Sequence, residues 1–272
     1  MEIEIFDVEH GACALITADN SSRLLIDCGH NSTTDWRPSK SLPARGIHTV
    51  EALVVSNYDE DHVSDLPNLL QNVYVPTLWR NPSVGPYDLY RLKSESGVGA
   101  GIGTLAHMAG NHYVAPLIKP LDFGDLRISY FWNTYPGFDD ENNLSLVTVL
   151  QYHDLGIIFP GDLEKAGWKQ LLLRRDFQVA LSGVNVFVAS HHGRETGYCP
   201  DVFSYCFPEI VVFSDKSVVH ETQKTAGLYR QHTRGVRFFD GETRHVLTTR
   251  NNGYIRLSKQ GAATAFVWIS RK

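Results

Sequence analysis

The sequence lacks the features that mark a membrane-spanning, exported or thiolate-zinc protein. No apolar run approaches the roughly 20 residues that a helix needs to cross a bilayer. The opening residues MEIEIFDVEH have neither the basic flank nor the apolar stretch of a signal peptide, so we expect no signal peptide and a cytoplasmic location. The four cysteines are widely spaced and include no C-x2-C pair, which argues against a disulfide scaffold and against a zinc site built from thiolates.

The chain also lacks a short repeat and a linker rich in proline, glycine or serine. Its 272 residues are 43% hydrophobic and 20% charged, which supplies a sizeable core and excludes a disordered or collagen-like chain. We therefore expect one domain over residues 1–272. Within it, the glycine-rich and polar residues 81–112 are expected to form an insert or a lid.

Negative charge predominates, but it is unevenly spread. The net charge is −5, with 9 Lys/Arg and 19 Asp/Glu in residues 1–150 (a net of −10) and 16 and 11 in residues 151–272 (a net of +5). The field of the whole molecule would not attract a polyanion, but the second half could do so if its basic residues share one face. The alternative is that both sets of charges are ordinary solvated surface.

Apolar runs bounded by turn residues predict a sheet protein with interspersed helices. Strands are expected over 2–8, 12–18, 23–28, 49–56, 72–80, 144–152, 155–160, 184–190, 209–214, 236–239, 245–249, 254–258 and 264–270, with two or three short ones within 113–135. Helices are expected over 63–71, 86–95, 101–109, 163–175, 200–206 and 221–232. This order favours two sheet layers with flanking helices.

Three polar clusters directly follow apolar strands. Asn57 to His62 follow LVVS, Asp162 follows GIIFPG, and His191 and His192 follow VFVAS. Taken alone, an aspartate after a strand is most often a helix N-cap, and a histidine pair is most often structural. Three such clusters on successive strand ends instead indicate metal ligation, because strand ends present functional groups rigidly. Carboxylates and imidazoles together form a mixed shell that suits zinc, manganese or iron.

The order of the motifs D-x-D-H, N-x-S-L-V, G-D and H-H-G resembles the metallo-β-lactamase family, and within it most closely the ComEC-type metallohydrolase domain of DNA uptake. The matching segments are 5–29, 54–66, 142–164, 186–193 and 246–257, and the resemblance is weakest over 81–130. It implies an α/β fold, the αββα sandwich in which two mixed sheets pack face to face with helices outside. It also implies a hydrolase, although this fold hosts many substrates.

The metal-loop pattern of the family, H-x-H-x-D-H, falls on Asn57, Asp59, Asp61 and His62. The pair that serves the second metal site, Asp61 and His62, is intact. The first site departs from the pattern, because Asn57 and Asp59 stand where the family has histidines and Asn142-Asn143 stands where it has an isolated one. The resemblance therefore implies an oxygen-rich first site, which would bind weakly or prefer a hard ion such as manganese or magnesium.

Two further strand ends complete the ligands that the resemblance implies. Asp162 matches the aspartate that bridges the two ions. Either His191 or His192 matches the last histidine ligand, with a slight preference for His191. We accordingly expect one or two divalent metal ions, zinc or manganese.

The expected catalytic residues are Asp61, His192, Lys216 and His220. A metal-activated hydroxide would attack phosphorus, and Lys216, His192 or His220 would hold the phosphate or protonate the leaving group. The first loop of the family reads here Glu9-His10-Gly11-Ala12. His10 therefore either lines the mouth of the site or is merely exposed.

We expect a metal-dependent hydrolase, a phosphodiesterase or nuclease that cleaves nucleic acid, with DNA favoured. Basic residues of the second half would guide the polyanion: Lys169, Arg174, Arg175, Arg194, Arg230 and Arg234. Two alternatives stay open, a small-molecule ester or phosphoester hydrolase on the same fold and a degenerate, metal-poor binding module. A protein partner from the same system is also expected.

Overall fold

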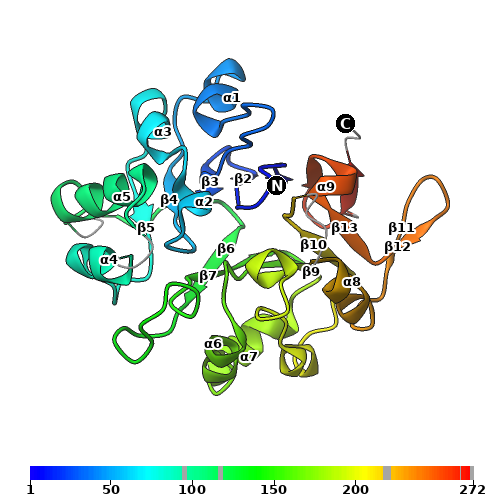
Figure 1. Cartoon of the computed structure of the whole chain (residues 1–272). Helices are drawn as coiled ribbons and strands as arrows, with labels where there is room; N and C mark the ends of the chain where they lie inside the picture. The colour runs from blue at the N-terminus through cyan, green and yellow to red at the C-terminus, as the bar shows by residue number, and fades with distance from the viewer. Residues whose placement is uncertain (94–96, 116–118, 217–221, 264, 270–272) are drawn as a thin grey trace.

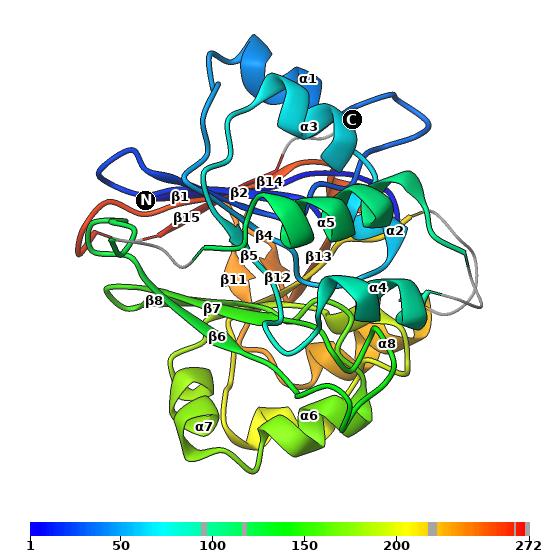
Figure 2. The same cartoon turned by 90° about the vertical axis from the view of Figure 1, so that its left-hand side faces the viewer.

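The computed structural model describes residues 1–93, 97–115, 119–216, 222–263 and 265–269 (Figure 1). Two large sheets pack face to face, and helices cover their outer surfaces (Figure 2). This arrangement confirms the predicted αββα sandwich. None of the described helices is long and apolar enough to cross a membrane.

The first sheet has seven strands in the order β15-β14-β1-β2-β3-β4-β5. They are β1 (Glu2–Ile5), β2 (Ala14–Thr17), β3 (Arg23–Ile26), β4 (Ala52–Val54), β5 (Leu78–Trp79), β14 (Ile255–Ser258) and β15 (Phe266–Ile269). β1, β2 and β3 pair antiparallel, whereas β3, β4 and β5 run parallel. The carboxyl ends of the parallel strands therefore lie at one edge of this sheet.

The second sheet has six strands in the order β13-β10-β9-β8-β7-β6. They are β6 (Arg127–Phe131), β7 (Val147–Tyr152), β8 (Leu155–Phe159), β9 (Val186–Val188), β10 (Ile210–Phe213) and β13 (Val246–Thr248). β8, β9, β10 and β13 run parallel, so the segments that follow them leave the sheet at one edge. A separate pair consists of β11 (Val236–Arg237) and β12 (Thr243–Arg244).

Alternating side chains bury both faces of each large sheet. Ile16 of β2 and Ile157 of β8 belong to the core between the sheets, whereas their neighbours Leu15 and Ile158 pack against helices. The first sheet is covered by α1 (Pro38–Ala44), α3 (Leu66–Asn72) and α5 (Ala100–Asn111). The second is covered by α6 (Lys165–Leu171), α7 (Arg175–Ser182) and α8 (Thr222–Arg230). The structure also has α2 (Glu60–Val63), α4 (Pro86–Leu92) and α9 (Thr249–Asn252).

Two predicted strand regions are wrong in extent. The strand over 72–80 reduces to β5, because Pro76 has no N–H to donate to a neighbouring strand. Residues 113–135 contain one described strand, β6, instead of two or three. Pro120 and the turn at Gly124, where φ is 61°, interrupt the apolar pattern before it.

Two predicted helices are each divided. The helix over 63–71 is two helices, α2 and α3, and Pro67 lies in the first turn of α3, where no N–H is needed. The helix over 163–175 ends at Leu171, and a second helix, α7, follows it. Arg174 has extended backbone between the two, and Phe177 of α7 is buried in the core.

Candidate metal centre

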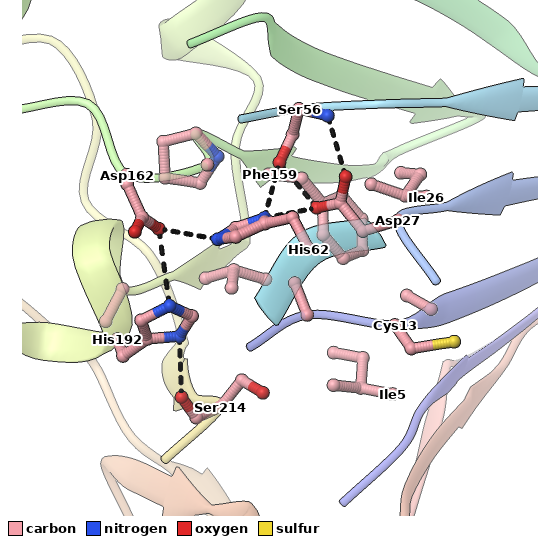
Figure 3. A pocket seen from close by; sticks show the side chains of 16 residues that line it. Ile5, Cys13, Ile26, Asp27, Ser56, His62, Phe159, Asp162, His192 and Ser214 are labelled. Carbon is pink, nitrogen blue, oxygen red and sulfur yellow. Dashed lines mark hydrogen bonds and ion pairs between the residues drawn. The ribbon is translucent and has the colours of Figure 1, made fainter. Parts of the chain in front are cut away.

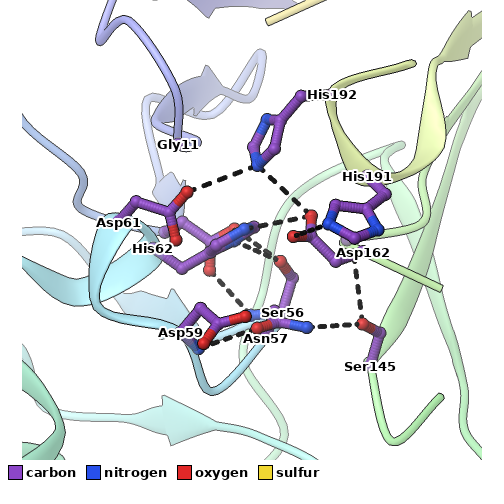
Figure 4. Close-up of polar contacts among 12 residues, drawn as sticks. Gly11, Ser56, Asn57, Asp59, Asp61, His62, Ser145, Asp162, His191 and His192 are labelled. Carbon is purple, nitrogen blue, oxygen red and sulfur yellow. Dashed lines mark hydrogen bonds and ion pairs between the residues drawn. The ribbon is translucent and has the colours of Figure 1, made fainter. Parts of the chain in front are cut away.

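Four side chains from the two halves of the chain meet at the edge where the parallel strands end (Figure 4). Asp61 and His62 lie in α2, shortly after β4. Asp162 follows β8, and His192 lies in the turn Ser190–Gly193 that follows β9. Nε2 of His62 lies 3.1 Å from Oδ1 of Asp162, and Nε2 of His192 lies 3.4 Å from the same oxygen.

The hydrogen bonds of His62 determine which ring nitrogen can bind an ion. Its Nδ1 lies 2.8 Å from Oδ2 of Asp27, and an ionised carboxylate can only accept. In the neutral ring Nδ1 therefore carries the hydrogen, and the lone pair is on Nε2, which faces Asp162. Asp27 is itself held in place, because it is buried and accepts from the main-chain N–H of Ser56 at 2.7 Å.

His192 is oriented in the same way. Its Nδ1 lies 3.0 Å from the carbonyl oxygen of Ser214 and must donate to it. Its Nε2 is buried, has no hydrogen-bond partner and lies 3.5 Å from Oδ2 of Asp61. Asp61, His62 and His192 each present a ligand atom, and these atoms lie within 4.8 Å of one another. An unpaired buried lone pair among two carboxylates and a second imidazole fits a divalent metal ion.

Burial disfavours charge in this cluster, but the neighbouring charges outweigh it. Burial lowers the pKa of His192, yet Asp162 and Asp61 raise it to about 10. Burial raises the pKa of Asp61, yet His192 and His62 lower it to about 2. The carboxylates therefore hold protons on the imidazoles when no ion is bound. A divalent ion and protons compete for the same nitrogen atoms.

A small cavity lies beneath these groups, between the two sheets (Figure 3). Its volume is about 30 Å³, which is room for about one water molecule. One side is polar, with His62 and Asp162, and the other is apolar, with Ile5 and Phe159. The cavity is too small for a substrate. A substrate must therefore approach from the side of Asp61, whose side chain is 35% exposed.

Two glycines hold the main chain of the metal loop. A Cβ added at Gly11 or at Gly29 would lie 2.3 Å from the carbonyl oxygen of Asp61. Side chains at these positions would therefore push Asp61 away from His192. The E-H-G-A and D-C-G segments, which follow β1 and β3, thus fix the position of a ligand that lies 32 residues beyond Gly29.

We expect Gly29→Ala to lower the free energy of unfolding by about 1–3 kcal/mol and to weaken metal binding, because the added methyl group collides with rigid backbone. Urea unfolding and metal titration measure the two effects. Gly103→Ala is the matched control: it lies within α5, and its nearest atom would be 3.8 Å away. This control should be as stable as the wild type or more stable. If the Gly29→Ala protein has the same free energy of unfolding and the same metal affinity as this control, the proposed contact is contradicted.

The two adjacent histidines of the H-H-G motif have different partners. Both have left-handed backbone, with φ of 51° and 54°. Nε2 of His191 accepts from Nη1 of Arg194 at 3.0 Å, and its Nδ1 lies 3.2 Å from Oε1 of Glu164. Nε2 of His191 is 3.7 Å from Oδ2 of Asp162. Arg194 thus uses the nitrogen of His191 that would bind an ion, and we therefore propose His192 as the histidine ligand in place of the slightly preferred His191.

The remaining predicted residues lie at or beyond the rim. Asn57 and Asp59 flank the cluster but bind other groups of the protein. Lys216 is 42% exposed, and its Nζ lies 3.4 Å from Oε2 of Glu9. His220 lies outside the described residues. His10 is near the cluster, with its ring centroid 5.9 Å from that of His192.

Sequence reasoning gave no role to Asp27 or Lys93. Asp27 follows the apolar strand RLLI, so the strand-end rule that identified Asp162 could also have identified Asp27. Lys93 lies in residues 81–112, the expected insert, where no motif pointed to a function. Its contact with Asp59 is visible only in three dimensions.

A family model, the metallo-beta-lactamase superfamily, matches residues 6–186. ComE operon protein 3 of Bacillus subtilis (strain 168) is 23% identical over 281 residues, which cover 94% of this chain and 32% of that protein. The chain thus spans about a third of the length of this relative.

Two solved structures are similar to this chain. CmlA, a diiron beta-hydroxylase from Streptomyces venezuelae, superposes with a TM-score of 0.50 at 11% identity, covering 90% of this chain and 53% of CmlA. Igni18, a metallo hydrolase from Ignicoccus hospitalis KIN4/I, superposes with a TM-score of 0.49 at 11% identity, covering 96% of this chain and 100% of Igni18. Because the family model matches most of the chain and includes Asp61, His62 and Asp162, this chain belongs to the metallo-beta-lactamase superfamily.

Proposed function

We propose that the protein is a metal-dependent phosphodiesterase that cleaves nucleic acid, with DNA as the favoured substrate. The observation that carries the proposal is the pair of imidazoles whose Nε2 lone pairs converge with two carboxylates. His62 and His192 would bind the ion through Nε2, and Asp61 and Asp162 would bind it through oxygen. An ion held there supplies a Lewis acid and lowers the pKa of a bound water molecule.

Cationic groups at the rim support a phosphate substrate. Arg194 is exposed, and its guanidinium group lies beside His191. Lys216 is half-exposed on the neighbouring segment. Arg194 and Lys216 lower the pKa of His10 and Asp61 raises it, so all three groups lie near this ring. A guanidinium group in this place would bind a phosphate through two parallel hydrogen bonds.

The choice of nucleic acid rests on the ComEC-type motifs and on the match to ComE operon protein 3. We further propose a cytoplasmic location. The match to ComE operon protein 3 supports a further proposal, that the chain works with a protein partner from the same system.

The first test is cleavage of single-stranded DNA by the purified protein, with and without added manganese or zinc, together with its metal content. Bound metal and metal-dependent cleavage are the expected result. Metal binding with hydrolysis of a small ester or phosphoester, but not of DNA, would replace nucleic acid by a small-molecule substrate. If the protein holds no metal after incubation with manganese or zinc, the proposed mechanism is overturned.

Arg194→Ala should raise KM for DNA by about tenfold and reduce its dependence on salt concentration, because one phosphate contact is lost. Metal content should stay that of the wild type. Arg127→Ala is the matched control, because this exposed arginine lies at the start of β6 and is not among the basic residues expected to guide the polyanion. An equal rise of KM for DNA in both variants would show that Arg194 acts only through the overall charge of the protein.

A further inference from the structure

Asn57, an expected ligand of a first metal ion, is already bound within the protein. It is fully buried. Its amide nitrogen donates to Oγ of Ser145 at 3.1 Å and to the carbonyl oxygen of Glu141 at 3.2 Å. Its carbonyl oxygen accepts from the main-chain N–H of Asp59 at 2.7 Å. The side chain therefore stabilises the metal loop, and its carbonyl oxygen is already used by the main chain of that loop.

Asp59, the other expected ligand in this loop, is paired with a buried lysine. Lys93 is 5% exposed, and its Nζ contacts Oδ1 of Asp59 and lies 2.8 Å from Oε1 of Glu141. A buried ammonium group is stable only when opposite charge and hydrogen bonds compensate for its lost hydration, and these two carboxylates do so. The Asp59 carboxylate is not part of the cluster formed by Asp61, His62 and His192.

We propose that the centre holds a single metal ion, at Asp61, His62, Asp162 and His192, and that the ammonium group of Lys93 takes the place of a second one. This inference deepens the proposed function and rests on it. The first site does not fit a metal ion, because a divalent ion bound to Asp59 would lie against a fixed positive charge. The protein supplies that charge from its own chain.

The insert 81–112 acquires a role from this assignment. Lys93 follows directly after α4, and α4 packs against α5. Oε1 and Oε2 of Glu60 accept from the main-chain N–H groups of Gly101 and Ile102 at the start of α5, at 2.7 and 3.2 Å. The insert thus holds the metal loop at Asp59 and at Glu60, the two positions that precede Asp61. The insert therefore supports the metal loop and supplies a positive charge beside Asp59.

The test is the number of ions bound, measured by elemental analysis and by calorimetric titration of the metal-free protein with zinc and with manganese. The wild type should bind one equivalent. Lys93→Ala frees the carboxylates of Asp59 and Glu141 and should bind a second, weaker equivalent. Lys259→Ala is the matched control, because Lys259 is also buried, with its Nζ 2.7 Å from Asp154, and has no metal ligand beside it. This control should still bind one.

Asp59→Asn provides a second variant if Lys93→Ala does not fold. It should bind one equivalent with an affinity within about threefold of the wild type, because Asp59 binds Lys93 and not the ion. Two equivalents in the wild type, one in a folded Lys93→Ala protein, or an equivalent lost in Asp59→Asn would each overturn the role of Lys93 while leaving metal-dependent hydrolysis intact. No ion bound to the wild type would overturn the whole centre, and the proposed function with it.

Discussion

Asp61→Asn is expected to lower kcat/KM for DNA on the order of 10³-fold and to weaken metal binding strongly, because it removes an anionic ligand while keeping the shape of the side chain. Oδ2 of Asp61 lies 3.5 Å from the unpaired Nε2 of His192, so the two would bind one ion. The side chain is partly exposed, and the fold should persist. Steady-state kinetics, metal titration and thermal unfolding measure the three quantities.

The matched control for this change is Asp201→Asn, an exposed aspartate in the turn Pro200–Ser204 on the second sheet's side. It removes the same charge from the whole molecule but should leave activity and metal affinity unchanged. Retention of more than about a tenth of the activity in Asp61→Asn would contradict a ligand role, since losing a transition-state ligand costs far more.

Asp27→Asn should lower metal affinity by about 10- to 100-fold, as changes to groups that orient metal-binding histidines do. The asparagine amide can donate to Nδ1 of His62, which moves the ring hydrogen to Nε2 and removes the lone pair that faces Asp162. Asparagine also tolerates the left-handed backbone of Asp27, where φ is 58°, so backbone strain should not obscure the result. Metal titration at fixed pH measures the change.

Asp65→Asn serves as the control for Asp27→Asn. Asp65 is equally buried and accepts from the main-chain N–H of Ser39 at 2.8 Å, but it contacts no residue of the metal cluster. Its replacement should lower stability without changing metal affinity. If both variants lose metal equally, Asp27 acts through the stability of the fold and not through the tautomer of His62.

The sequence predicted the sheets well, because their strands are short apolar runs bounded by turn residues. In β2 and β8, neighbouring residues such as Leu15 and Ile16 face opposite layers, and both are apolar since both faces are covered. The ends of helices were harder to predict from the sequence. Leu171 ends α6 although the apolar pattern continues into Phe177, and only the extended backbone of Arg174 separates the helices.

The site was partly predictable for the same physical reason. Asp61, His62 and Asp162 follow apolar strands, and the order of parallel strands brings such ends together. The choice between His191 and His192 depends on two consecutive left-handed residues, which sequence spacing does not reveal. The role of Lys93 could not be predicted from the sequence, because it comes from the packing of α4 and not from any local pattern.

The division of the cluster between two halves of the chain has a consequence for how the protein forms. His62 and Asp162 are 100 positions apart and belong to segments that leave different sheets. Neither half alone could present the cluster, and chain entropy opposes bringing such distant residues together before the sheets have packed. We therefore expect the centre to be assembled late in folding. Its capacity to bind an ion reports that both halves have reached their native arrangement.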